Sequence, residues 1–260
     1  MATRLAPSST LVAPIARSAA GLFNLILPHR CARCSTVLAS GPGFCAACWG
    51  AIDWLDGPAC ARCDMPLPQE QHEGALCGGC ELKPPPYARV HAALAYGRAA
   101  RQLVIRFKYG RRIGTASLLA KLMARRLPGH ELGAPVPLLV PVPLTRARLW
   151  RRGFNQALLL AEELAKLRGG EVARDLLQRR GDRGSQRGLT RAARAQRLRG
   201  AFQVEPKARD RLRGLTVLLI DDVFTSGATA DAAARALRRA GAARVEVVVF
   251  ARVLDGRGDP

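Results

Sequence analysis

The chain has 260 residues, of which 48% are hydrophobic, and its formal net charge is +21. This length accommodates one sizeable core and a small additional module, and the hydrophobic content excludes disorder of the whole chain. The charge is concentrated in residues 98–213, which hold 28 Lys+Arg and 8 Asp+Glu. Such a segment favours polyanions, either a diphosphate substrate or a nucleic-acid backbone.

Residues 1–30 are predicted to form an N-terminal helical leader. A short apolar patch at residues 19–27 follows Arg17, but no small-residue cleavage site comes after it. An amphipathic helix is therefore favoured over an export signal. No apolar run approaches the roughly 20 residues needed to span a bilayer. We expect a cytoplasmic protein without membrane insertion.

All eight cysteines lie within residues 31–82, the predicted second segment. They form four C-x-x-C pairs: Cys31/Cys34, Cys45/Cys48, Cys60/Cys63 and Cys77/Cys80. Two intervening residues let both sulfurs of a pair reach one tetrahedral ion, so eight thiolates suffice for two four-sulfur zinc sites. The spacing suits sequential or interleaved pairing. A disulfide framework and an iron–sulfur cluster are the alternatives, but the regular repetition favours a double zinc ribbon with one or two structural Zn ions.

A stiff linker with three consecutive prolines is expected over residues 83–89, before a second domain over residues 90–254. The patterns of that domain predict strands over 90–96, 138–142, 215–220 and 245–250. They predict helices over 99–107, 115–127, 155–168 and 230–240. This alternation is typical of an α/β fold with a parallel sheet flanked by helices.

A polar, glycine-rich and basic segment covers residues 179–200, between the second and third predicted strands. We interpret it as a loop that closes over a site and excludes water, or whose arginines contact a nucleic-acid backbone. A solvent-exposed loop is the alternative. Only Phe202 lies at its end, which argues against a base-stacking platform within this loop.

The most informative stretch is residues 214–229, where an apolar run ends in Asp221 and Asp222. A small-residue turn then opens the next helix, with Thr225, Ser226, Gly227, Ala228 and Thr229. Backbone amides at a helix start suit a phosphate, and carboxylates suit vicinal hydroxyls. An ordinary strand-to-helix turn is the alternative. Neither GxxxxGK[ST] nor GxGxxG occurs in the chain, so the common nucleotide-binding loops are excluded.

This stretch resembles the phosphoribosyl-diphosphate loop of type I phosphoribosyltransferases. The resemblance implies that Asp221 and Asp222 bind the ribose hydroxyls, that the turn at 225–229 holds the 5′-phosphate, and that phosphoribosyl diphosphate (PRPP) binds with Mg²⁺. Lys108 resembles the residue that meets pyrophosphate in such folds. Arg152, before a glycine and a helix start, is a further phosphate-binding candidate. A surface lysine and a solvated basic turn are the alternatives for these two residues. Asp221, Asp222 and Lys108 are the predicted catalytic residues.

Over nearly its whole length the chain resembles the ComF family, which couples a zinc-ribbon module to a phosphoribosyltransferase-like domain. Besides the cysteine pairs and the acidic loop, the resemblance rests on Phe107-Lys108-Tyr109, Val140-Pro141-Val142-Pro143-Leu144, Arg152-Gly153-Phe154-Asn155-Gln156, and Gln186, Leu189 and Arg194. Arg197 stands where the family usually has Asn.

Two functions follow from this resemblance. The first is an enzyme that transfers the phosphoribosyl group of PRPP to an acceptor, in nucleotide salvage or in DNA uptake during competence. The second is a non-catalytic protein that binds single-stranded DNA and uses the fold as a ligand sensor or scaffold. The resemblance implies single-stranded DNA and other DNA-uptake proteins, such as a helicase, as partners.

Overall fold

The computed structural model describes residues 28–39, 41–109, 114–128, 136–180, 196, 198 and 200–254. The predicted leader up to residue 27 lies outside these residues. So do Arg197 and residues 181–195 of the basic loop, with Gln186, Leu189 and Arg194. Contacts divide the chain into two compact units, Met1–Ala51 and Ile52–Pro260.

The first unit carries the first half of the cysteine module. An isolated bridge between Arg30 and Val37 closes the loop that holds Cys31 and Cys34. Ser35, directly after this pair, adopts a left-handed conformation with φ 67°. The helix α2 (Ala46–Gly50) begins after Cys45 and carries Cys48. Each pair therefore sits at a tight change of chain direction, as expected for a zinc knuckle.

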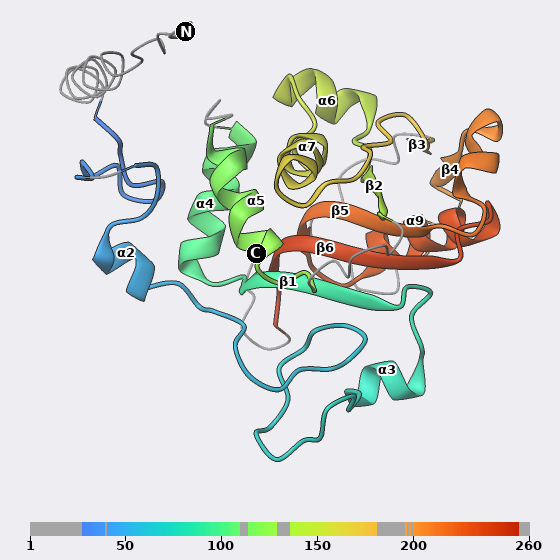
Figure 1. Ribbon diagram of the computed structural model, residues 1–260, viewed down its shortest axis with the longest axis horizontal. Coiled ribbons are helices and arrows are strands. Elements are labelled where there is room, and N and C mark those ends of the chain that lie inside the picture. The colour runs from blue at the N-terminus through green and yellow to red at the C-terminus, as the bar shows by residue number, and fades with distance from the viewer. Residues whose placement is uncertain are drawn as a thin grey trace, which may run out of the picture. The chain divides into compact units, whose positions relative to one another are not determined.

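The second unit is built on a four-stranded parallel sheet with the order β1-β6-β5-β2. Its strands are β1 (Arg89–Ala95), β2 (Leu138–Pro141), β5 (Thr216–Phe224) and β6 (Arg244–Arg252). Figure 1 shows β1, β6 and β5 side by side, with α5 and α7 above them in this view. The apolar runs of these strands are buried, as parallel sheets require. The predicted α/β class is confirmed.

The strand β5 is longer than predicted. The sequence indicated residues 215–220 and a chain that leaves the sheet at the acidic pair. Pairing with β6 instead continues from Asp221 opposite Val249 to Phe224 opposite Arg252. The backbone hydrogen bonds of this ladder outweigh the low strand preference of aspartate. Asp221 and Asp222 therefore lie within the last paired residues of β5, and their side chains point to opposite faces of the sheet.

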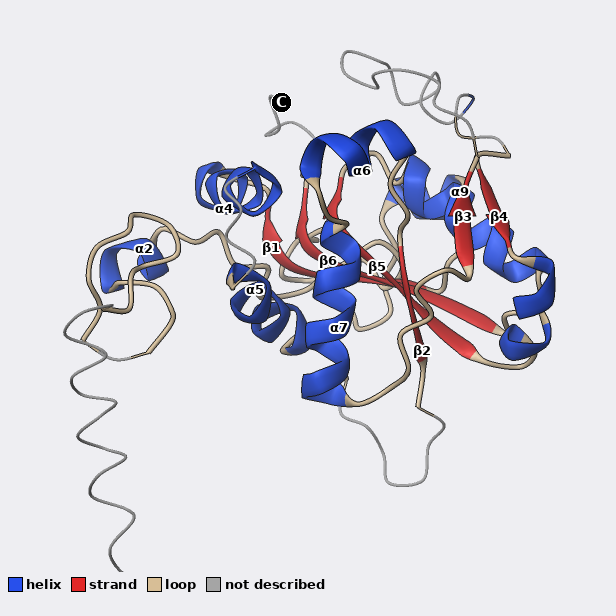
Figure 2. Cartoon of the chain, turned by 90° about the horizontal axis from the view of Figure 1, so that it is seen from above, coloured by secondary structure: helices blue, strands red, loops and turns tan. Residues whose placement is uncertain are grey.

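The second unit has four longer helices: α4 (Arg98–Tyr109), α5 (Thr115–Ala124), α7 (Gln156–Arg168) and α9 (Ala228–Arg239). Of these, α5, α7 and α9 pack on the sheet. Alternate β5 residues face different helices. Leu218 lines a cavity with Leu164 of α7, whereas Leu219 belongs to the same apolar cluster as Leu237 of α9. Figure 2 shows α5 and α7 together on one side of the sheet. Along the described ranges, no helix is long and apolar enough to cross a bilayer.

Several short elements were not predicted. They are α3 (Gly78–Leu82), α6 (Arg146–Arg152), β3 (Leu177–Arg179), β4 (Phe202–Val204) and the 3-10 turns η1 (Pro206–Ala208) and η2 (Asp210–Leu212). Thr145 caps α6 by accepting from the Arg148 amide at 3.4 Å, and Gly153 ends it at φ 79°. The Asn155 side chain then accepts from the Ala157 amide at 3.1 Å and starts α7.

The outer edge of β1 is covered by the second half of the cysteine module. Buried Asp64 accepts from the Ala92 amide at 2.9 Å and pairs with Arg126 at 3.2 Å. The Val90 amide donates to the Arg62 carbonyl at 2.8 Å. These contacts pair an otherwise open sheet edge. Residues 52–82 thus belong to the same compact unit as the sheet.

Candidate functional site

The acidic pair lies near the carboxyl end of β5, the edge at which open α/β sheets bind their ligands. Asp222 is buried at 8% exposure, and Asp221 is partly exposed. The Asp222 amide donates to Asp221 Oδ1 at 2.8 Å. This contact fixes one carboxylate against the backbone of its neighbour.

Lys108, at the end of α4, meets the acidic pair directly. Its Nζ lies 2.8 Å from Asp222 Oδ2, and the two side chains are 19% and 12% exposed. A mostly buried ion pair of this kind costs desolvation and is weak evidence of a stabilising role. The fold therefore brings together two of the predicted catalytic residues, which are 114 positions apart in the chain.

Asp221 has an environment that disfavours its charged form. Burial, together with the negative charge of Asp222, raises the pKa of Asp221 to about 7. The Asp222 amide and the positive charges of Lys108 and Arg179 act in the opposite direction. Near neutral pH this carboxyl is thus poised between its protonated and ionised forms. Such perturbed groups are concentrated at functional sites.

The turn after β5 lies beside Asp221. Thr225, Gly227 and Thr229 line, with Asp221, a small cavity of about 20 Å³. That is room for about one water molecule, so a larger ligand would lie over the turn. Gly227 has φ 77°, and a Cβ there would lie 3.0 Å from Cζ of Phe224. Glycine is required at this position by both conformation and space.

Ser226 and Ala228 complete the predicted turn. Ser226 is partly exposed, and Ala228 is buried as the first residue of α9.

Arg152 lies apart from the acidic pair but is connected to it through α4. Its guanidinium lies 5.4 Å from the ring centroid of Tyr109, the neighbour of Lys108. It also donates to Gln156 Oε1 at 2.9 Å. The buried Arg152 Nε and Gln156 Nε2 have no hydrogen-bond partner among the described residues. These donors suit an anionic or polar ligand group.

Sequence reasoning missed two contributors to this region. Arg179, at the end of β3, acts on Asp221 through its charge, and Tyr109 supports Arg152. Tyr109 belongs to the Phe107-Lys108-Tyr109 segment, but nothing in the sequence assigns it a role. Arg179 is one of many arginines in its segment, and no local pattern distinguishes it from the others.

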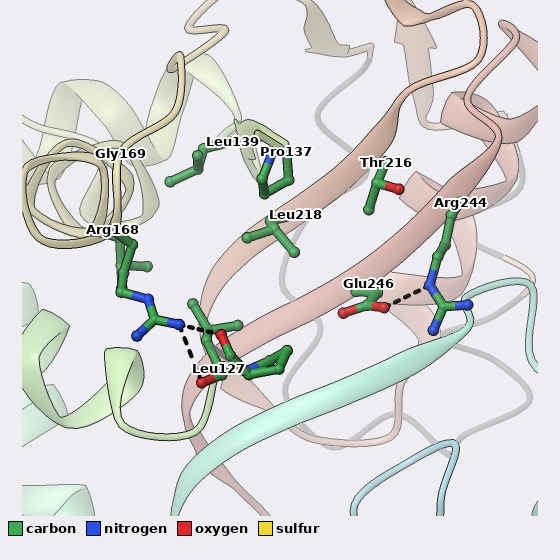
Figure 3. A pocket seen from close by; sticks show the side chains of 11 residues that line it. Leu127, Pro137, Leu139, Arg168, Gly169, Thr216, Leu218, Arg244 and Glu246 are labelled. Carbon is green, nitrogen blue, oxygen red and sulfur yellow. Dashed lines mark hydrogen bonds and ion pairs between the residues drawn. The ribbon is translucent and has the colours of Figure 1, made fainter. Parts of the chain in front are cut away.

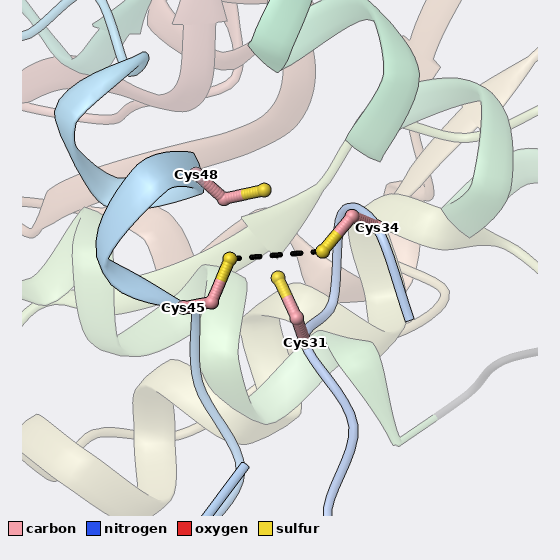
Figure 4. Close-up of side chains that lie close together, drawn as sticks. All are labelled: Cys31, Cys34, Cys45 and Cys48. Carbon is pink, nitrogen blue, oxygen red and sulfur yellow. Dashed lines mark hydrogen bonds between the residues drawn. The ribbon is translucent and has the colours of Figure 1, made fainter. Parts of the chain in front are cut away.

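The cysteines form two separate clusters with sequential pairing. Cys31, Cys34, Cys45 and Cys48 form the first, and Cys60, Cys63, Cys77 and Cys80 form the second. The sulfurs of each cluster lie within 4.8 Å of one another. Figure 4 shows the first cluster, whose Cys34 and Cys45 sulfurs lie 3.6 Å apart. Tetrahedral ligands at the usual Zn–S distance are about 3.8 Å apart, so both sets fit structural zinc.

A larger cavity of about 230 Å³ lies between α7 and the sheet (Figure 3). Its lining includes Thr216 and Arg244, the first residues of β5 and β6, so it opens at the amino ends of the strands. Leu139, Leu164 and Leu218 make much of it apolar. None of the predicted site residues lies here, and the cavity is distinct from the acidic site.

Two domain models match this chain. Residues 22–81 match the Double zinc ribbon domain, and residues 151–260 match the Phosphoribosyl transferase domain. A B. subtilis glutamine phosphoribosylpyrophosphate amidotransferase structure is 20% identical, with a TM-score of 0.37 over 55% of this chain and 30% of that chain. The domain match and the sheet topology together define a phosphoribosyltransferase-like protein that carries a double zinc ribbon.

Relatives along almost the whole chain identify the family. DNA utilization protein YhgH of Escherichia coli K12 is 33% identical over 237 residues, covering 88% of this chain and 100% of the relative. Competence protein F of Haemophilus influenzae is 30% identical over 216 residues, covering 81% and 90%. The chain belongs to the ComF family, which confirms the resemblance drawn from the sequence.

Proposed function

We propose that the carboxyl edge of the sheet binds PRPP together with Mg²⁺. The observation that carries this proposal is the ion pair of Lys108 with Asp222, beside Asp221 and next to a glycine turn at the start of α9. Asp221 and Asp222 would accept hydrogen bonds from the ribose hydroxyls. The amides and hydroxyls of residues 225–229 would hold the 5′-phosphate.

The basic residues suit the other end of the ligand. Lys108 and Arg152 would contact the diphosphate, and Mg²⁺ bound to that group supplies further charge neutralisation. Phosphoribosyl transfer expels pyrophosphate as the ribose gains positive character, so stabilisation of these charges is the main requirement. Asp221, Asp222 and Lys108 would perform this role without a protein nucleophile.

Titration calorimetry on the zinc-loaded full chain tests this proposal. PRPP with Mg²⁺ is compared with pyrophosphate with Mg²⁺, which lacks the ribose. Asp221→Asn should lose PRPP affinity and keep pyrophosphate affinity, because only a ribose contact is removed. Asp222→Asn should also lose PRPP affinity, but its pyrophosphate affinity should stay or rise, because Lys108 is freed from its ion pair. The exposed Asp175→Asn serves as a control for the loss of one negative charge. Absence of PRPP binding to the parent protein would refute the proposal.

Chemistry is tested separately from binding. Pyrophosphate release is measured with PRPP, Mg²⁺ and a panel of nucleobases. Turnover that depends on Asp221 and Asp222 supports phosphoribosyl transfer. Binding without turnover under any acceptor favours a ligand sensor.

A second candidate function is binding of single-stranded DNA in DNA uptake. Its support is the +20 charge of residues 98–213 and the names of the relatives, which refer to DNA utilization and competence. The expected signature is an affinity that falls steeply with salt. Salt-independent binding would contradict it. The two functions are compatible, since PRPP at the acidic site leaves most basic side chains accessible.

A further inference from the structure

The helix α6 exposes its side chains instead of packing them into the core. None of its seven residues is buried. Trp150 is 92% exposed and Leu149 is 43% exposed. The helix is held by its ends, through the Thr145 cap and the left-handed Gly153. Because the Trp150 indole adds almost nothing to the core, its large apolar surface has no role in folding.

This exposed tryptophan stands among positive charges. The segment Arg146–Arg152 contains four arginines and no acid. Arg146 and Arg151 are exposed, and neither forms an ion pair with any described residue. Arg146 lies four residues before Trp150 and therefore on the same helical face. The helix thus presents an aromatic ring with one guanidinium on the same face, and a second exposed guanidinium, that of Arg151, about 100° around the helix.

The position of α6 links this face to the acidic site. The helix follows the carboxyl end of β2, which pairs with β5 (Figure 1). Its last residue, Arg152, lies over Tyr109, which is 51% exposed and follows Lys108. Lys108 in turn pairs with Asp222. A ligand on α6 would thus lie beside the mouth of the proposed PRPP site.

We infer that the exposed face of α6 binds single-stranded DNA, with a base stacked on Trp150 and phosphates contacted by Arg146 and Arg151. An aromatic ring flanked by cations is the combination that holds single strands without sequence preference. This inference rests on the proposed DNA-binding function and names the part of the protein surface that binds the DNA. It also supplies the stacking residue that the basic loop at 179–200 lacks.

Charge and size argue against other occupants of this face. A second copy of the chain would bring two strongly basic proteins together. An anionic membrane would receive only two apolar side chains from a helix of less than two turns. A separate basic groove of about 670 Å³, the second groove below, is lined by Arg62, Arg235, Arg238, Arg239 and Arg244. Its tyrosine, Tyr87, is buried, so that groove offers phosphate contacts without stacking.

The test measures binding of a fluorescent 20-nucleotide oligothymidylate to the zinc-loaded full chain at several salt concentrations. Trp150→Ala should weaken binding roughly 5- to 140-fold with little change in the salt slope, because a stacked base is lost and no charge is removed. Trp150→Phe should retain most of the affinity. The double variant Arg146→Ala/Arg151→Ala should reduce the salt slope by about 1.4, as expected for two phosphates.

Matched controls separate this surface from general charge. Arg235→Ala/Arg239→Ala removes two charges from the second groove and should leave oligothymidylate binding nearly unchanged. The oligonucleotide should quench tryptophan fluorescence in the parent and much less in Trp150→Phe. Thermal unfolding of Trp150→Ala should match the parent, since the residue is exposed.

Three results would overturn the inference. The first is unchanged oligonucleotide affinity in Trp150→Ala, and the second is a greater loss in the Arg235/Arg239 control. The third is binding to phosphatidylserine vesicles that depends on Trp150 while DNA binding does not. If the parent binds no oligonucleotide, the DNA-binding function fails together with this inference. The PRPP titration of the same sample then shows separately whether the acidic site binds PRPP.

Discussion

Replacing Asp221 by Asn should make the free protein more stable at neutral pH. Burial and the charge of Asp222 raise the pKa of Asp221 to about 7, against an ordinary value of 3.8. The fold therefore binds this proton more tightly than the unfolded chain does. The free energy of unfolding therefore falls as the pH rises from about 4 to about 7, because over this range Asp221 loses its proton in the unfolded chain but keeps it in the fold.

The size of this effect follows from the pKa difference. About three pKa units correspond to roughly 4 kcal/mol when Asp221 is fully ionised. The Asp221 side chain keeps some contact with solvent, which screens part of the effect. We therefore expect Asp221→Asn to gain on the order of 2–3 kcal/mol at pH 8 and close to nothing at pH 4.

Urea unfolding of the zinc-loaded protein between pH 4 and pH 8 measures this difference. The quantity of interest is the free energy of unfolding of Asp221→Asn minus that of the parent at each pH, which removes contributions from other titrating groups. Asp175→Asn, at an exposed position, should give a nearly flat difference. A flat difference for Asp221→Asn, or a loss of stability at pH 8, would refute the reasoning.

Three further predictions concern the acidic site and the cysteine clusters. Lys108→Met should destabilise the protein by roughly 1–3 kcal/mol in urea unfolding, because it leaves a mostly buried carboxylate without its cation, whereas Lys108→Arg should retain most of the stability. Gly227→Ala should cost about 1–3 kcal/mol, and more than Gly153→Ala, since both have positive φ but only Gly227 also lacks space for a Cβ. Cys60→Ser and Cys31→Ser should each lose one zinc ion in a dye assay. Only Cys60→Ser should lower the melting temperature of the sheet, because Cys60 lies in the same unit as the sheet and Cys31 does not. Equal effects of both changes would contradict the division into two units.

The architecture of the second unit was predictable because its elements carry local signals. Apolar runs in the sequence indicated β5 and β6. A capping asparagine followed by an apolar helical face indicated α7. The end of β5 was not predictable, since the pairing that holds Asp221 and Asp222 in the sheet comes from β6, later in the chain. The helix α6 was missed because it has no apolar face and is held by its end caps.

In the candidate site, too, features with a local sequence pattern were predictable and contacts between distant residues were not. The eight cysteines and the acidic turn were recognisable from spacing alone. The sequence left the cysteine pairing open because the gaps suit both arrangements, and the structure shows the sequential one. The contact of Lys108 with Asp222 and that of Asp64 with β1 join residues far apart in the chain. Neither has a local sequence signal.

The proposed PRPP site makes a prediction about the protonation of the acidic pair. A sheet gains nothing from two adjacent carboxylates, one of which is driven towards its neutral form. The ribose hydroxyls would donate hydrogen bonds to the ionised form of Asp221 and would therefore lower its pKa. PRPP binding should then release a proton near pH 7. The same Asp221→Asn change should then stabilise the free protein and abolish stabilisation by PRPP. Opposite signs for these two effects, measured on one variant, distinguish a binding residue from a structural one.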